Sequence, residues 1–211
     1  MLIVVTAGLS ACRSTAPRPV EPAAALPADA EAGSDAVVSM VPPAASDAFA
    51  RALAAMDASQ WLEAEQILEA LIEVYPDYPG PFVNLAIVYR EDGREQEAKD
   101  ALAQALAISP NHPAANNQLG MLERERGDFT AAEAAYRRAL AQAPDYALAH
   151  YNLGVLLDLY LYRNDEALIH YESYQALSLQ PDPTVDLWVA DLRRRLGVPP
   201  EDSQLAQEDG S

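Results

Sequence analysis

Apolar residues recur through residues 45–180 at intervals of three and four positions, which is the spacing of one face of an α-helix. The whole pattern also returns every 34 residues, because chemically similar residues occupy equivalent positions at that interval. The equivalent positions include Pro76, Pro110 and Pro144; Leu85, Leu119 and Leu153; Tyr78, His112 and Tyr146; and Asn84, Gln118 and Asn152. A period of this length, with helical spacing inside each unit, predicts stacked helix–turn–helix units.

Small residues stand where the two helices of a unit must approach each other closely. They are Ala86, Ala98 and Ala105 in the second unit (79–112) and Gly120, Ala132 and Ala139 in the third (113–146). Larger apolar side chains fill the space between units. Gly93 and Gly127 fall at the predicted turns between helices, where glycine permits a tight backbone.

These positions resemble the tetratricopeptide repeat, and the resemblance covers about residues 45–180. The second and third units match almost position for position, whereas the first helix of the first unit (about 45–78) is out of step by about one residue. The fourth unit (147–180) carries an insertion, and its predicted turn at 161–164 lacks glycine, so we expect a longer turn there. The resemblance implies an all-α fold, a right-handed α-solenoid of about four helix pairs. With a capping helix, the repeat domain is expected to span 46–197.

The capping helix is predicted over residues 183–196, where apolar residues recur at intervals of three, four and seven. Pro183 suits the first turn of a helix and Gly197 suits the position after its last residue. A single helix with one polar face is what an open end of a repeat array needs. The three arginines at 193–195 would oppose the helix dipole favourably, and a basic docking patch is the alternative interpretation.

The N-terminal residues have the features of a secretory signal. A short apolar run is followed by Leu9-Ser10-Ala11-Cys12, which resembles a bacterial lipobox. The resemblance implies that residues 1–11 are cleaved as a signal peptide and that Cys12, the only cysteine, is lipidated, with palmitate among its chains. Arg13 after the cysteine implies the outer membrane, facing the periplasm. No Lys or Arg precedes the apolar run, so a start upstream of Met1 or a chance cysteine are the alternatives.

The segments that flank the predicted repeat domain are poor in large apolar side chains. Residues 12–45 are rich in proline and alanine and are predicted to form a disordered tether between membrane and domain. Residues 198–211 begin with two prolines, continue polar and acidic, and are predicted to form a disordered tail.

Charge and composition exclude several classes of function. The chain of 211 residues has a net charge of −18, which argues against a nucleic-acid partner because phosphates would be repelled. One cysteine excludes a disulfide framework, and the three histidines lack metal-ligand spacing. No phosphate loop or nucleophile motif occurs, so we expect a protein that is not an enzyme and has no cofactor or metal. A hydrolase around His150 and His170 is the less favoured alternative. Glu95, Glu97 and Glu133 are interpreted as ordinary solvent-exposed residues.

The resemblance also implies a peptide-binding groove on the concave face, which we expect to be mostly exposed in the free protein. Amides there could pair with a peptide backbone, and Arg90 and Arg124 could bind carboxylates. The lysines that bind chaperone tails are replaced, so chaperone tails are not expected as ligands. Alternatively, Asn84 and Asn152 only bond neighbouring backbone. The groove residues are Val83, Asn84, Ile87, Arg90, Asn117, Gln118, Met121, Arg124, Tyr151, Asn152, Val155 and Leu159.

The sequence therefore predicts a lipid-anchored periplasmic scaffold or adaptor that binds protein or peptide partners. It resembles repeat lipoproteins that help pilus secretins assemble or that organise peptidoglycan enzymes, which implies a role in assembling a cell-envelope complex. The alternative is an accessory protein that binds a small ligand or glycan through tyrosines of the fourth unit. Those tyrosines are Tyr151, Tyr160, Tyr162, Tyr171 and Tyr174.

Overall fold

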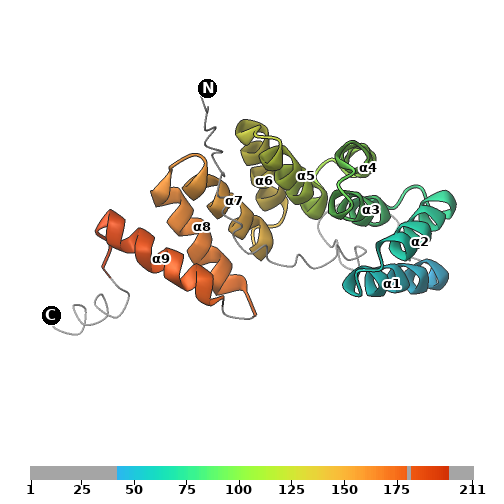
Figure 1. Ribbon diagram of the computed structural model, residues 1–211, viewed down its shortest axis with the longest axis horizontal. Helices are drawn as coiled ribbons and strands as arrows, with labels where there is room; N and C mark the ends of the chain where they lie inside the picture. The colour runs from blue at the N-terminus through green and yellow to red at the C-terminus, as the bar shows by residue number, and fades with distance from the viewer. Residues whose placement is uncertain (1–41, 180–181, 200–211) are drawn as a thin grey trace, which may run out of the picture.

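The computed structural model describes residues 42–179 and 182–199, and these form nine α-helices and no strand (Figure 1). The helices are α1 (Pro43–Asp57), α2 (Trp61–Val74), α3 (Pro79–Glu91), α4 (Glu95–Ile108), α5 (Pro113–Glu125), α6 (Phe129–Gln142), α7 (Ala147–Leu159), α8 (Asn164–Leu177) and α9 (Pro183–Leu196). The first eight form four pairs, and α9 follows the last pair. The prediction of an all-α solenoid of helix pairs is therefore confirmed.

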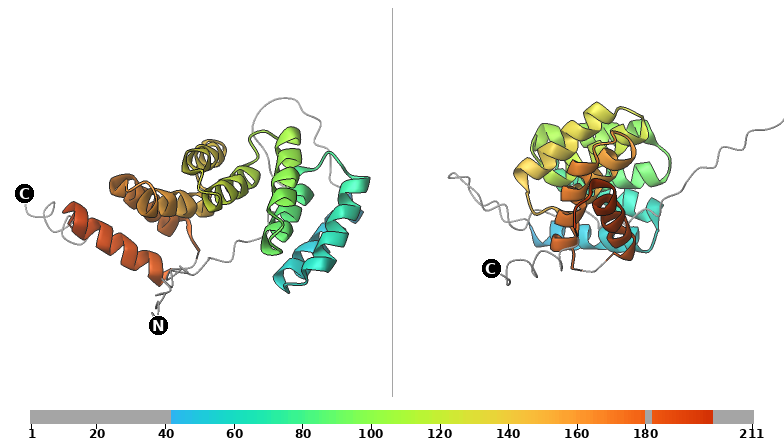
Figure 2. Two further views of the ribbon diagram at one scale, coloured as in Figure 1. Left: turned by 45° about the horizontal axis from the view of Figure 1, so that its top comes forward. Right: turned by 90° about the vertical axis from the view of Figure 1, so that its left-hand side faces the viewer.

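The helix pairs stack side by side along a curved array (Figures 1 and 2). The two helices of each pair contact each other most, and the second helix of a pair packs on the first helix of the next. The first helices also contact one another, α3 with α5 and α5 with α7, more than the second helices of neighbouring pairs do. Because elements on the inside of a curve lie closest together, α3, α5 and α7 lie on the inner face.

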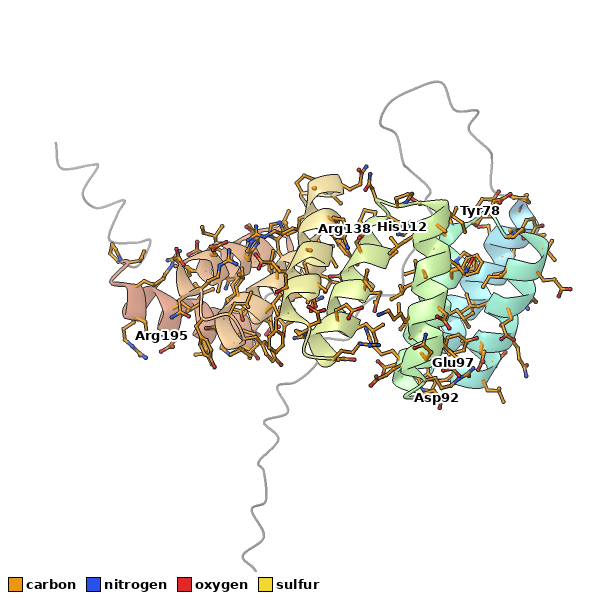
Figure 3. The ribbon with its side chains drawn as sticks, turned by 90° about the horizontal axis from the view of Figure 1, so that it is seen from above. Tyr78, Asp92, Glu97, His112, Arg138 and Arg195 are labelled. Atoms are coloured by element: carbon orange, nitrogen blue, oxygen red, sulfur yellow. The ribbon has the colours of Figure 1, made fainter. Side chains whose placement is uncertain are left out.

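The two kinds of turn lie at opposite edges of this array. Seen from above, Tyr78 and His112, which precede α3 and α5, lie at one edge, whereas Asp92 and Glu97 of the second unit lie at the other (Figure 3). Tyr78 and His112, which are 34 residues apart, therefore lie at the same edge in successive pairs.

The turns within the pairs explain the glycines of the sequence. Gly93 and Gly127 have φ angles of 75° and 83°, a left-handed conformation that costs glycine little. In the fourth unit Tyr162 takes this conformation instead, with φ 55°. The turn there occupies residues 160–163, one residue more than the turns at 92–94 and 126–128. The prediction of a longer turn is therefore confirmed, although the turn lies one residue earlier than the predicted 161–164, because Asn164 begins α8.

Close approach within the pairs depends on small residues that face large ones. A Cβ added at Gly120 would lie 2.5 Å from a ring carbon of Tyr136, and one added at Gly154 would lie 2.8 Å from the ring of Tyr171. Both rings are fully buried. The equivalent positions in the second unit hold Ala86 and the smaller Leu102, which are also buried. The size of one residue is therefore matched to the size of its neighbour in these three pairs.

The last helix, α9, has the range predicted for the capping helix and buries Val185, Val189 and Leu192. Trp188 is half-buried, and its ring centroid lies 5.4 Å from that of Tyr171. Gly197 ends the helix in the left-handed conformation, with φ 70°.

The arginines of α9 are paired with carboxylates. Arg193 lies 2.7 Å from Glu172, Arg195 lies 2.9 Å from Asp191, and Arg194 also pairs with Asp191. These contacts favour the helix-stabilising interpretation over a basic docking patch. None of the helices within 42–179 and 182–199 is both long and apolar enough to cross a membrane.

The start of the array differs from the prediction. Helix α1 begins at Pro43, with proline in its first turn, so the segment expected as a tether up to residue 45 ends at residue 42 or earlier. Cys12, the signal peptide at 1–11 and the rest of the tether lie outside the described residues, as does the tail from residue 200.

Candidate peptide-binding groove

The inner face of α3, α5 and α7 carries the twelve residues predicted to line a groove, but most of them are not exposed. The eight that are buried are Val83, Asn84, Ile87, Asn117, Gln118, Tyr151, Asn152 and Val155. Arg90, Met121 and Arg124 are half-buried, and Leu159 is 49% exposed. The expectation of a mostly exposed face is therefore wrong. One physical reason is that the first helices contact each other directly, which sequence spacing alone does not reveal.

Polar side chains of the inner face join successive units. Arg90 Nη1 on α3 donates to Gln118 Oε1 on α5 at 2.5 Å. Asn152 Nδ2 on α7 donates to Asn117 Oδ1 on α5 at 3.1 Å. Residues about one repeat apart in the sequence thus meet across both junctions between first helices, so polar side chains of the inner face join three successive units.

The amides differ in what they bond. Asn84 Nδ2 donates to the backbone oxygen of Gly80 in its own helix at 3.0 Å, as the alternative interpretation expects. Asn152 instead reaches the side chain of Asn117, so that interpretation is wrong for Asn152. Asn117 accepts this hydrogen bond because α5 and α7 contact each other directly.

The two arginines of the inner face, Arg90 and Arg124, each have a buried nitrogen that forms no hydrogen bond with a described residue. Only 9% of the Arg90 side chain is exposed, and Nη2 lies 3.3 Å from the carboxylate of Glu91. The Nε atoms of both Arg90 and Arg124 are buried and have no hydrogen-bond partner among the described residues. The charge of Arg124 acts on Tyr151: burial raises the pKa of Tyr151 to about 12, Asp182 adds to this rise and Arg124 opposes it.

The tyrosines proposed as a stacking surface are mostly part of the core. Tyr151, Tyr171 and Tyr174 are buried, and the ring centroids of Tyr151 and Tyr174 lie 5.3 Å apart. Tyr162 is 80% exposed, and Tyr160 is 40% exposed with its ring packed on Phe129. The five tyrosines therefore do not form one accessible surface, which removes the main support for a small-ligand or glycan site.

His150 and His170 do meet, with their Nδ1 atoms 2.9 Å apart. His150 Nε2 also lies 2.9 Å from the carbonyl oxygen of Pro144, to which it can only donate. The two Nδ1 atoms can share one proton and no more, since two N–H groups would face each other. Burial, and then the neighbouring His150, lower the pKa of His170 to about 4. This arrangement accounts for both imidazoles as structural groups.

Within the described ranges no three His, Cys, Asp or Glu side chains gather as metal ligands.

An ion-pair network on the second helices was missed by the sequence analysis. Glu133 on α6 lies 2.8 Å from both Arg137 and Arg163, and Glu166 on α8 lies 2.9 Å from Arg137. Arg163 also pairs with Glu166. Glu133 is thus a link between the third and fourth units, and its interpretation as an ordinary solvent-exposed residue is wrong. The spacing of Glu133 and Arg137 was a signal for one contact, but the contacts between units had none.

The fold and the inner face define a helical-repeat scaffold for protein–protein interactions. A family model described as "Tetratricopeptide repeat" matches residues 55–122, and one described as "TPR repeat" matches residues 120–158. The chain belongs to the tetratricopeptide repeat family.

Solved structures share the fold at low sequence identity. Pseudomonas aeruginosa PilF superposes with a TM-score of 0.64 at 21% identity, over 72% of this chain and 68% of that chain. A thermophilic TPR protein of Thermus thermophilus has a TM-score of 0.60 at 19% identity, over 73% of this chain and 84% of that chain. The Thermobaculum terrenum O-GlcNAc transferase is an enzyme, with a TM-score of 0.57 at 22% identity, but the match covers only 26% of that chain. No curated protein matches this sequence.

Proposed function

We propose that this protein is an adaptor of the cell envelope that binds an extended segment of a partner protein along the inner face of α3, α5 and α7. The observation that carries the proposal is that polar side chains join the first helices at both junctions of that face. Arg90 meets Gln118 across one junction and Asn117 meets Asn152 across the next. A ligand that lies along this face would touch three successive units, which is how a repeat array gains affinity from small contributions.

The inner face also offers the two kinds of group that an extended peptide needs. The half-buried guanidinium groups of Arg90 and Arg124 can bond a peptide, and the half-buried Met121 and the exposed Leu159 offer apolar surface to its side chains. Burial of Tyr151 and Tyr171 in the core argues against the alternative of a small-ligand site.

The proposed location of the protein at a membrane rests on Cys12. If it is lipidated, the Cys12→Ser protein should leave the membrane fraction and no longer incorporate labelled palmitate. The loss from the membrane fraction should be nearly complete, because several acyl chains anchor a protein firmly and the variant would carry no acyl chain. Equal membrane retention of the variant would refute the lipid anchor while leaving the adaptor function untouched.

Photo-crosslinking in cells tests the binding face. A photoreactive amino acid placed at Met121 or at Leu159 should form an adduct with a discrete partner. Matched placements at Gln104 on α4 and at Ile169 on α8, both exposed on second helices, should not. Adducts that form only from Gln104 or Ile169 would move the binding face to the outer side of the array and refute the proposal.

A further inference from the structure

We infer that the segment bound by the inner face is acidic, with two carboxylate side chains about three residues apart, one for Arg90 and one for Arg124. This inference rests on the proposed function and adds the chemistry of the ligand. It starts from two guanidinium groups of the inner face: Arg124, which forms no ion pair with a described residue, and Arg90, whose one carboxylate partner is the adjacent Glu91.

Arg124 is half-buried and forms no ion pair with any described residue, and its Nε is buried without a partner. Arg90 is more deeply buried. Its Nη2 lies 3.3 Å from the carboxylate of the adjacent Glu91, its Nη1 donates to the neutral groups of Gln118 and Met121, and its Nε has no hydrogen-bond partner among the described residues. A buried guanidinium without a paired anion is unfavourable. An anionic ligand would supply the missing anion at Arg124 and add a second anion at Arg90, beside Glu91.

A shortage of carboxylates does not explain these arginines, since the chain carries 32 acidic residues against 14 basic ones. Seven other arginines lie within 4.0 Å of a carboxylate: Arg94, Arg126, Arg137, Arg163, Arg193, Arg194 and Arg195. Arg124 has no such carboxylate among the described residues, which is also true of the exposed Arg51 and of Arg138, whose Nε donates to Asn116. Of these three, Arg124 lies on the face where a partner segment is proposed to lie.

The repeat sets both the number and the spacing of the carboxylates. Arg90 and Arg124 are 34 residues apart and hold the same position in α3 and α5. The same position on α7 is Asp158, which pairs with Arg195 at 3.4 Å, and on α1 it is the buried Met56. The row of cations therefore has two members.

Packed helices lie about 8–10 Å apart, and an extended chain advances about 3.3 Å per residue, so the two carboxylates belong about three residues apart. Guanidinium groups bind carboxylates in a bidentate manner, which favours them over other anions of a peptide. A chain end offers one carboxylate, whereas two units require two, so at least one of them is an Asp or Glu side chain, and we place both on side chains.

The test uses the full-length protein and two fluorescein-labelled peptides, Ala-Val-Glu-Leu-Pro-Glu-Val-Ala and the same peptide with both Glu replaced by Gln. Fluorescence polarisation should show the diglutamate peptide binding at least tenfold more tightly. Arg90→Gln and Arg124→Gln should each weaken its binding about tenfold, and Arg124→Lys, which keeps the charge, should weaken it less. Arg51→Gln on α1 makes the same charge change at an exposed site and should have no effect. Circular dichroism establishes that each variant is folded.

Equal binding of the two peptides, or no binding of the diglutamate peptide at millimolar concentration, would overturn the inference. Equal losses in Arg51→Gln and Arg124→Gln would do the same, because they would indicate general electrostatics. In cells, the adduct from Met121 should disappear in the Arg90→Gln, Arg124→Gln double variant. An adduct that persists there would overturn the acidic ligand while the adaptor function stands, and no adduct from either Met121 or Leu159 in the parent protein would overturn the adaptor function.

The chain's own acidic residues provide the competing occupant. A full-length variant with Asp29, Glu31 and Asp35 replaced by Ser should bind the diglutamate peptide as tightly as the parent protein. A gain of tenfold or more would assign the arginines to that segment of the chain and overturn their assignment to a partner.

Discussion

The close approach of Gly120 and Tyr136 makes a prediction that tests how the helix pairs are built. A Cβ at Gly120 would lie 2.5, 2.6 and 2.9 Å from three carbons of the Tyr136 ring, which is fully buried. Replacing Gly120 with Ala should therefore force the ring or the helix to move. The second unit shows the permitted combination, Ala86 with Leu102 at the same two positions.

The expected magnitude follows from two opposing effects. Overpacking a core costs about 1–3 kcal/mol, and the value should lie near the top of this range because three ring atoms clash. Replacing a helical glycine by alanine gains about 0.5–1 kcal/mol, so Gly120→Ala should destabilise the protein by about 2 kcal/mol net. After Tyr136→Leu, the added methyl group fills space and contributes about 0.8 kcal/mol besides the helix gain. The same Gly120→Ala change should then stabilise by about 1–2 kcal/mol.

Urea denaturation followed by circular dichroism measures the four proteins of this cycle. The coupling free energy between the two positions should be about 3–4 kcal/mol, at or slightly above the upper end of what contacting residues show. Ala86→Gly is the matched control in the second unit and should destabilise, because Leu102 leaves room for the methyl group that is removed. If Gly120→Ala stabilises the protein in both backgrounds, the size matching described here is wrong.

Three further predictions concern other contacts of the array. His170, whose folded pKa is about 4 against an ordinary 6.5, takes up its proton more readily when unfolded, so the melting temperature should fall as pH drops from 6.5 towards 4 and should fall less in His170→Gln. Glu133→Ala removes the carboxylate shared by two arginines and should cost about 1 kcal/mol, an effect that 1 M salt should largely remove in thermal melts. Trp188→Ala should cost about 2 kcal/mol, less than a fully buried Trp, whereas Leu187→Ala on the exposed side of α9 should leave the melting temperature unchanged.

The elements of this fold could be predicted because their signals are local. Helical spacing of apolar residues, the glycines at 93 and 127, and Pro183 with Gly197 each act within a few residues of the structure they determine. The 34-residue period then implied the stacking, since equivalent surfaces must meet equivalent surfaces. The start of α1 at Pro43 was missed because the proline-rich sequence before it masked the helix signal.

The contacts of the candidate site could not be predicted to the same depth. Arg90 meets Gln118 across 28 residues and Asn152 meets Asn117 across 35, and these meetings depend on the distance and tilt between α3, α5 and α7. Sequence periodicity selects the face on which a residue lies but does not say how closely neighbouring units approach. For this reason the amides were expected to be exposed and are buried. The sequence correctly predicts that these amides lie on the inner face, but it does not predict that they are buried.

The charge of the whole chain gives the proposed complex a distinctive dependence on salt. A protein of net charge −18 repels an acidic segment at long range, whereas Arg90 and Arg124 attract it only once it is close. Salt screens charges beyond a Debye length of about 8 Å at physiological ionic strength, so it should relieve the repulsion before it weakens the buried contacts. The association rate of the diglutamate peptide should therefore rise as salt increases from low concentration, opposite to the usual behaviour of oppositely charged partners. Stopped-flow polarisation measures this rate directly, and a rate that falls steadily with salt would mean that the surface as a whole, not two inner arginines, attracts the peptide.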